Sequence, residues 1–133
     1  MKRVLVIDDS DLVVEALRNA LGRDGIIIES IADISTLDRD RRPDFQLGDF
    51  DLVLMDVRMP ARFDESVEVV TRQRETASTP ILLLSSLPET QLATRVQQTG
   101  LDGYILKALG VDGVADEVRA WIHGRKQRSG GGA

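Results

Sequence analysis

One stretch of the chain reads Asp51-Leu52-Val53-Leu54-Met55-Asp56-Val57-Arg58-Met59-Pro60. Its apolar run from Leu52 to Met55 lies between polar and turn-forming residues, which is typical of a strand buried on both faces in a parallel sheet covered by helices. Asp56 follows the run, so it stands at the carboxyl end of that strand. Open α/β folds bind their ligands along this edge of the sheet. We therefore expect Asp56 to belong to a functional site.

A second stretch near the N-terminus has the same form. The apolar run from Val4 to Ile7 leads directly into Asp8 and Asp9. If this strand and the strand ending at Asp56 are parallel neighbours, three carboxylates converge on one patch. Like charges at such distances repel unless a cation or a proton lies between them. The pattern thus predicts a cation or a proton between the carboxylates of the patch.

The remaining chain alternates strand and helix patterns. Apolar runs predict further strands at residues 26–28, 81–84 and 103–106, and amphipathic or capped segments predict helices at 12–21, 64–70, 88–98 and 114–122. The first helix is expected to bury Leu12, Val13, Ala16, Leu17, Ala20 and Leu21. Strands that alternate with helices require right-handed crossovers. We therefore expect an α/β fold with a doubly wound, five-stranded parallel sheet and helices on both faces.

Two segments stand outside this alternation. Residues 35–48 begin with a helix-start pattern at Ser35 but carry no apolar residue from Asp38 to Arg42, so we expect a short helix of about two turns and then a loop. Residues 125–133 are basic and then glycine-rich, which is the composition of a flexible linker. The expected organisation is one domain over residues 1–124 followed by a flexible tail over 125–133.

Composition limits the classes of function. The 133 residues carry 17 basic and 22 acidic side chains, for a net charge of −5, and a nucleic-acid-binding protein usually shows the opposite balance. The chain has no cysteine, which fits a reducing compartment. It shows neither a signal-peptide pattern nor an apolar run long enough to span a membrane. We expect a cytoplasmic protein that binds neither nucleic acid directly nor a membrane.

The ends of the predicted strands carry complementary chemistry. Ser85 follows the fourth strand and Lys107 follows the fifth, on the edge where Asp8, Asp9 and Asp56 are expected. Clustered carboxylates are ligands for Mg²⁺. A carboxylate can also act as a nucleophile that forms an aspartyl phosphate. Metal, ammonium and hydroxyl donors are what phosphoryl transfer needs to neutralise the transferred oxygens. This set therefore indicates phosphoryl transfer to Asp56, with Lys107 and Ser85 assisting.

At these residues the sequence resembles the receiver domains of bacterial two-component response regulators. The resemblance runs from about residue 2 to residue 124, and its motifs are Val4 to Ser10, Asp51 to Asp56 with Met59-Pro60, Pro80 to Ser85, and Gly103 to Lys107. It implies a flavodoxin-like strand order 2-1-3-4-5. It also implies a signalling module that catalyses only its own phosphorylation and dephosphorylation.

The resemblance assigns roles to individual residues. Asp56 would accept the phosphoryl group, and Mg²⁺ would be held by Asp8, Asp9, Asp56 and the backbone carbonyl of Arg58. Ser85, five residues after Pro80 and preferred for that reason over Ser86, would bind phosphoryl oxygens together with Lys107. Tyr104 would follow Ser85 and pass the change to the face formed by the helix at 88–98, the strand at 103–106 and the helix at 114–122.

The resemblance also implies partners. The phosphoryl donor would be a sensor histidine kinase or a phosphotransfer protein, the downstream partner would be an unidentified protein, and phosphorylation-dependent homodimerisation stays open.

The sequence departs from the family pattern at two positions. Lys107 is followed by Ala108, where the family usually has proline after a cis bond. A cis bond before a non-proline residue costs about 2.5–4 kcal/mol, so either this bond is trans or the site retains a costly cis bond. Arg58 either reaches the phosphoryl group or faces solvent.

Two other functions remain as alternatives. Asp9-Ser10-Asp11-Leu12-Val13 matches the first motif of haloacid dehalogenase-type phosphohydrolases, but that interpretation leaves Asp56 without a role and places Asp112 and Asp116 on a helix. A receiver-like module that is never phosphorylated is the other alternative, and Ala108 is the feature that favours it.

His123, the only histidine, is expected at the surface. No output domain follows the last helix within these residues, so the chain is either a stand-alone receiver or part of a longer one.

Overall fold

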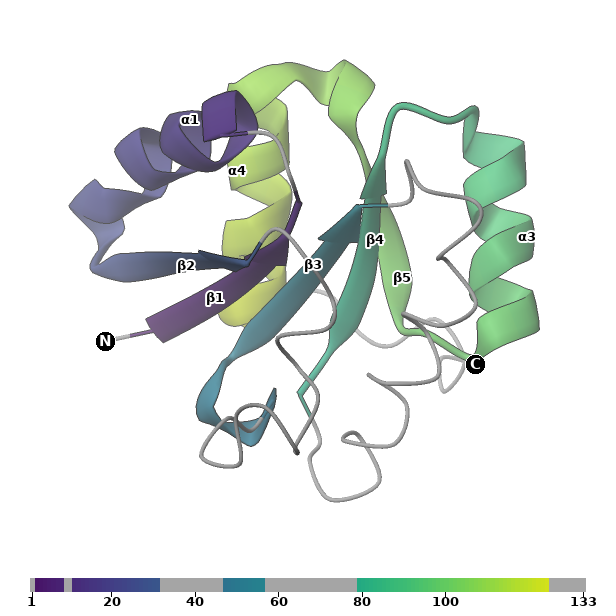
Figure 1. Ribbon diagram of the computed structural model, residues 1–133, viewed down its shortest axis with the longest axis horizontal. Helices are drawn as coiled ribbons and strands as arrows, with labels where there is room; N and C mark the ends of the chain where they lie inside the picture. The colour runs from purple at the N-terminus through teal and green to yellow at the C-terminus, as the bar shows by residue number, and fades with distance from the viewer. Residues whose placement is uncertain (1, 9–10, 32–46, 57–78, 125–133) are drawn as a thin grey trace.

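The computed structural model describes residues 2–8, 11–31, 47–56 and 79–124. Within them lies a five-stranded sheet in the order β2-β1-β3-β4-β5, and every neighbouring pair of strands is parallel (Figure 1). The strands are β1 (Lys2–Ile7), β2 (Ile26–Ile31), β3 (Leu52–Asp56), β4 (Ile81–Ser85) and β5 (Gly103–Leu106). The expected strand order and parallel sheet are confirmed.

Three α-helices and several short 3-10 helices connect the described strands. The α-helices are α1 (Asp11–Leu21), α3 (Glu89–Thr99) and α4 (Gly110–Ile122). The 3-10 helices are η1 (Gly22–Asp24), η3 (Leu47–Asp49) and η4 (Lys107–Leu109). The short helix predicted to begin near Ser35, the helix predicted at 64–70 and the tail at 125–133 lie outside the described residues.

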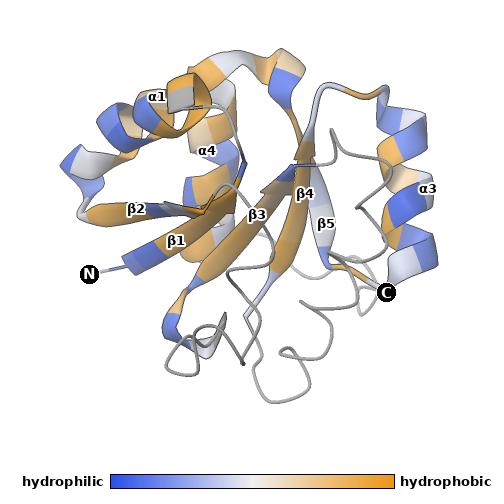
Figure 2. Cartoon of the chain, viewed as in Figure 1, coloured by the Kyte–Doolittle hydropathy of each residue, from blue (hydrophilic) through white to orange (hydrophobic). Residues whose placement is uncertain are grey.

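Alternate residues of the central strands face opposite sides of the sheet, and each side has its own apolar core. Val4 and Val6 of β1 pack with apolar residues of α1 and α4, whereas Leu5 and Ile7 pack with apolar residues of α3. Figure 2 shows β3 and β4 as apolar along most of their length. Helices therefore cover both faces, and strands buried in this way require the unbroken apolar runs that the sequence displays.

The first helix differs from its prediction in one respect. Leu12 was expected to be buried, yet this residue is 86% exposed. Val14, which was not included in the apolar stripe, is only 4% exposed. Leu17 and Leu21 are buried as expected. Three consecutive apolar residues at the start of this helix allow more than one phase of the stripe. Packing against α4 and the sheet selects the phase that buries Val14 with Leu17 and Leu21.

Arg119 ties the end of α4 to the end of α1. Its Nε donates to Asp24 Oδ2 at 2.6 Å and its Nη2 donates to the backbone carbonyl of Ala20 at 3.0 Å. Its Nη1 donates to Asp116 Oδ1 at 2.8 Å. The hydrogen bond to Asp24 is the main cause that raises the pKa of Arg119 above its ordinary value. The Arg119 guanidinium therefore joins the last turn of α4 to the C-terminal end of α1 and to the 3-10 helix that follows it.

No helix among the described segments is long and apolar enough to cross a membrane.

Candidate functional site

The strand ends place the predicted side chains along one edge of the sheet. Asp8 follows β1 directly, Asp56 is the last residue of β3, Ser85 is the last residue of β4, and Lys107 follows β5. The strands are parallel and in register, with Asp56 opposite Leu84 and Ser85 opposite Leu106. Because carboxyl ends of parallel strands meet on the same side, these residues share that edge.

Lys107 lies between two of the acidic residues. Its Nζ is 3.2 Å from Asp8 Oδ2 and 3.5 Å from Asp56 Oδ1. The side chain of Asp8 is completely buried, that of Asp56 is 7% exposed and that of Lys107 is 18% exposed. Two carboxylates so shielded from water repel each other strongly unless a cation offsets them. Lys107 supplies one positive charge to both.

The donor set fits a divalent cation. Asp8 and Asp56 contact the same ammonium, so their oxygens already converge, and Mg²⁺ typically takes one or two carboxylates and completes its shell with water and phosphate oxygens. Within the described ranges, no three Asp, Glu, His or Cys side chains are grouped so that they could hold a metal ion. Asp9 and Arg58, the other two expected ligands, lie outside those ranges, so their positions stay predictions.

Ser85 presents a buried hydroxyl at the end of β4. Ser85 is 1% exposed, whereas Ser86 is exposed, and the choice of Ser85 for the site stays a prediction. Its Oγ accepts a hydrogen bond from the backbone N–H of Leu87 at 3.1 Å. That bond uses a lone pair, so the hydroxyl proton remains available, and no described residue accepts it. The contact with Leu87 was not predicted from the sequence, although a serine hydroxyl that accepts from the N–H two residues later is a known turn pattern.

Tyr104 stands on β5, two residues before the position that pairs with Ser85. It lies opposite Leu83 in the β4–β5 register and packs against the apolar core beneath α3. Its side chain is partly buried. The tyrosine therefore lies on the strand beside the one that carries Ser85, on the face of the sheet that α3 covers.

The peptide bond between Lys107 and Ala108 is trans, because the described residues contain no cis peptide bond. The chain passes directly from β5 into η4. The alternative of a retained cis bond at this position is thereby excluded. Lys107 nevertheless reaches both carboxylates from this conformation.

The residues that the hydrolase alternative needs are arranged differently. Asp112 and Asp116 lie on α4 and not at a strand end, and Asp116 forms an ion pair with Arg119 at the surface. His123 is exposed at the end of α4, as expected. None of these three residues joins the pair of carboxylates around Lys107.

The chain is similar in sequence to known regulatory proteins. The family model for the response regulator receiver domain matches residues 4–119. The transcriptional regulatory protein CseB of Streptomyces coelicolor is 28% identical over 130 residues, covering 97% of this chain and 52% of CseB. The chemotaxis protein CheY of Halobacterium salinarum is 29% identical, covering 88% of this chain and 93% of CheY.

Solved structures agree with this assignment. A response regulator from Thermotoga maritima superposes with a TM-score of 0.71 at 26% identity, covering 92% of this chain and 98% of that one. The chain spans about half the length of several of the curated relatives it matches. The matched family model and the shared strand order together show that the chain belongs to the response regulator receiver domains of two-component signalling systems.

Proposed function

We propose that Asp56 accepts a phosphoryl group from a sensor histidine kinase or a phosphotransfer protein. An oxygen of the Asp56 carboxylate attacks phosphorus, and the bond from phosphorus to the donor nitrogen breaks, leaving its electron pair on the donor imidazole. The observation that carries this proposal is the contact of Lys107 Nζ with both Asp8 and Asp56 at a strand edge almost closed to water. A carboxylate held beside a fixed cation is oriented for this reaction.

Each neighbouring residue has a defined task in the proposal. Lys107 offsets negative charge on the transferred phosphoryl oxygens, and Ser85 donates its free hydroxyl proton to one of them. Asp8, Asp9, Asp56 and the backbone carbonyl of Arg58 would hold Mg²⁺. When bound, that ion neutralises charge on the same oxygens.

The output of the domain would follow from Ser85. When the Ser85 side chain moves toward a phosphoryl oxygen, its Oγ would draw away from the Leu87 N–H, and Tyr104 on the adjacent strand would repack. The surface formed by α3, β5 and α4 then changes, and a downstream protein partner binds it. The domain acts as a signalling switch, and the reaction it catalyses is its own phosphorylation and dephosphorylation.

The test uses acetyl phosphate with Mg²⁺ as the donor and intact-mass spectrometry as the readout. Wild-type protein should gain one acid-labile phosphoryl group, and Asp56→Asn should gain none. Asp51→Asn is the matched control, because it makes the same change at the residue just before the opposite end of β3 and keeps an acceptor for the Arg3 N–H. It should be phosphorylated as the wild type is.

Other outcomes would contradict the proposal. Loss of phosphate uptake in Asp9→Asn with retention in Asp56→Asn would place the nucleophile on the first strand, as in the hydrolase alternative. Absence of phosphate uptake in the wild type, together with no binding of Mg²⁺ or beryllofluoride, would make the domain a binding module that is never phosphorylated.

A further inference from the structure

The strand β2 forms one edge of the sheet in the part of the chain that the structure describes (Figure 1). It pairs with β1 on its inner side, and no described strand pairs with its outer side. Its sequence, Ile26-Ile27-Ile28-Glu29-Ser30-Ile31, is mostly β-branched and apolar and carries a single charge. Segments of this composition pair readily with strands of other molecules when their edge is open. The outer edge of β2 therefore needs protection from self-association.

One hydrogen bond fixes the direction of the backbone groups of β2. The N–H of Asp8, directly after β1, donates to the Ile31 carbonyl at 3.1 Å, so the backbone groups of Ile31 point toward β1. Successive residues of a strand direct their N–H and C=O groups to alternate sides. Ile28 lies three positions before Ile31, so its N–H and carbonyl point to the outer side. The N–H of Ser30 points to the outer side for the same reason.

The outer carbonyl of Ile28 is occupied by Arg18 of α1. Arg18 Nη2 donates to the Ile28 oxygen at 3.2 Å. The other terminal nitrogen of the guanidinium, Nη1, pairs with Glu15, which lies one turn earlier on α1. A strand that joined β2 would have to place its own N–H at the Ile28 oxygen, where the guanidinium now lies. Arg18 thus lies in the path of a strand that would extend the sheet beyond β2.

The side chains of β2 itself offer little resistance to another strand. Ile26 and Ile28 are buried in the core beneath α1, whereas Ile27 is 40% exposed. Glu29, the one charged residue of the strand, is paired with Arg3, whose Nε lies 2.7 Å from Glu29 Oε2. Charged side chains that point out from an edge strand are a common device against pairing, and β2 has no basic residue of its own. Arg18 supplies this charge from the neighbouring helix.

We propose that Arg18 blocks the outer edge of β2, and that a chain without this guanidinium dimerises by antiparallel pairing of β2 with β2 of a second copy. Such a pair has two-fold symmetry, so each hydrogen bond between the copies forms twice. Ile28 lies at the centre, where its N–H and carbonyl bond to those of the second Ile28. In this register Glu29 lies opposite Ile27 of the other copy, so the two glutamates do not meet.

The second copy is the occupant because the outer edge is complementary to itself. Ile28 presents one donor and one acceptor, which are the groups that a reversed Ile28 requires. In the wild type, the same arrangement would bring the two Arg18 guanidinium groups together at the centre, and like charges across an interface are unfavourable. The proposal concerns the chain without phosphate, so its test is independent of the phosphoacceptor role of Asp56.

Sedimentation velocity on the 133-residue chain without a phosphoryl donor, from about 10 μM to about 1 mM, measures the association. Arg18→Met keeps a long apolar side chain and removes the guanidinium. Its dimer Kd should be at least about tenfold lower than that of the wild type, because the central Ile28 groups become available. Amide hydrogen exchange identifies the surface. Exchange at Ile28 and Ser30 should slow as Arg18→Met is concentrated, because both N–H groups point to the outer edge.

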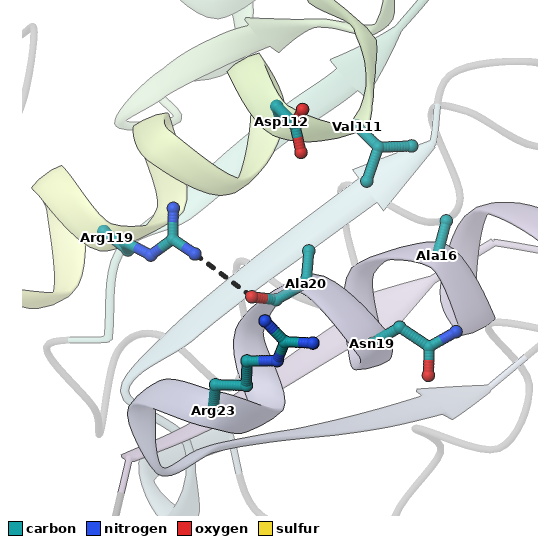
Figure 3. A pocket seen from close by; sticks show the side chains of 7 residues that line it. All are labelled: Ala16, Asn19, Ala20, Arg23, Val111, Asp112 and Arg119. Atoms are coloured by element: carbon teal, nitrogen blue, oxygen red, sulfur yellow. Dashed lines mark hydrogen bonds between the residues drawn. The ribbon is translucent and has the colours of Figure 1, made fainter.

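Three further variants separate the guanidinium at the edge from charge in general. Arg23→Met removes the same charge just after α1, but Arg23 lines a pocket that α1 shares with α4, and the Kd should match that of the wild type (Figure 3). Arg18→Lys keeps a positive charge beside the edge and should also stay close to the wild type. Glu15→Gln releases the guanidinium from its ion pair and should lower the Kd by a smaller factor than Arg18→Met.

A proline on β2 tests the direction of the pairing. Ser30→Pro removes an N–H from the outer edge and none from the ladder with β1, so the Kd of Arg18→Met/Ser30→Pro should return to within about threefold of the wild type. Circular dichroism should show that the variants are folded, and Glu15→Gln carries the test if Arg18→Met is not. Association of Arg18→Met no stronger than that of Arg23→Met overturns the proposal. Exchange at Ile28 that does not depend on concentration, or a double variant that still associates, overturns it equally.

Discussion

Nζ of Lys107 lies 3.2 Å from Oδ2 of Asp8, although 99 positions separate the two residues in the chain. The same nitrogen lies 3.5 Å from Oδ1 of Asp56. Lys107 reaches both carboxylates because β1 and β3 are neighbours in the sheet and β5 ends on the same edge. One cation therefore offsets two carboxylates that have almost no access to water.

Lys107→Met removes this cation and should destabilise the protein. Without the ammonium, the carboxylates of Asp8 and Asp56 lose their contact with Lys107, and breaking a buried ion pair costs about 3 kcal/mol. Urea unfolding at neutral pH without metal should show the loss in the free energy of unfolding. Addition of Mg²⁺ should recover much of it, because a divalent ion binds only the folded arrangement of the carboxylates.

Lys107→Arg is the control for the charge. It keeps a cation next to both carboxylates and should lose much less stability than Lys107→Met. If Lys107→Met unfolds at the same urea concentration as the wild type, Lys107 does not neutralise the site.

Ser85→Ala removes the hydroxyl donor while the nucleophile Asp56 is kept, so it measures the contribution of the hydroxyl to the rate of phosphorylation. Asp56 remains, so phosphate is still taken up from acetyl phosphate, but the initial rate should fall at least about tenfold because one donor to the phosphoryl oxygens is missing. Ser85→Thr keeps the hydroxyl and should retain most of the rate. Quenched time courses on phosphate-affinity gels give both rates. Equal rates for Ser85→Ala and the wild type would remove Ser85 from the reaction.

The strand ends were predictable from the sequence because strands that are buried on both faces consist of unbroken apolar runs. The residue that follows such a run can only stand at the edge of the sheet, so the order of residues along the chain is enough to group Asp56, Ser85 and Lys107. The phase of the first helix was not predictable to the same degree. Leu12 and Val14 are both apolar, and only packing against α4 and the sheet decides which of them is buried.

Contacts between distant polar residues have no local signal in the sequence. Arg119 and Asp24 are 95 positions apart, and nothing in the periodicity of either segment pairs them. A surface pocket lined by Ala20 of α1 and Arg119 of α4 depends on the same long-range packing. Periodicity predicts which face of an element is apolar, but the crossing of two helices fixes which exposed charges meet.

Gly103→Ala should strain the contact between β5 and α4. A Cβ at this position would lie 3.1 Å from the Trp121 ring and 3.3 Å from Leu82 Cδ2, so a packed core must move to admit a single methyl group. Overpacking of this kind costs about 1–3 kcal/mol. Urea unfolding followed by the fluorescence of Trp121, the only tryptophan, reports both the stability and the displaced ring.

Gly22→Ala serves as the matched control for this substitution. The same methyl group at Gly22 would meet nothing within 4 Å, and the free energy of unfolding should be unchanged or slightly higher. The smaller ring in Trp121→Phe should reduce the cost of Gly103→Ala. Full additivity of Gly103→Ala and Trp121→Phe would show that the two residues do not compete for space.

Arg119→Met should weaken the attachment of α4 to α1 by the same amount over a wide range of pH. The guanidinium donates to Asp24, Asp116 and the Ala20 carbonyl, and its loss should lower the free energy of unfolding by about 1–2 kcal/mol. The hydrogen bond to Asp24 raises the pKa of Arg119 in the folded protein, so folding favours the charged form. A raised pKa gives stability that is fully present below the ordinary arginine value and is lost only as the pH rises through the folded value.

Chemical unfolding of the wild type and Arg119→Met at about pH 7 and about pH 10 tests this sign, because arginine stays charged in both states across that interval. The difference between the two proteins should be the same at both values. Asp116→Asn is the control at the exposed end of these contacts. The Asp116 side chain is 77% exposed, so loss of its charge should change the free energy of unfolding by less than about 0.5 kcal/mol. A difference that declines toward pH 10 would mean that a group other than the Arg119 guanidinium carries the link between α1 and α4.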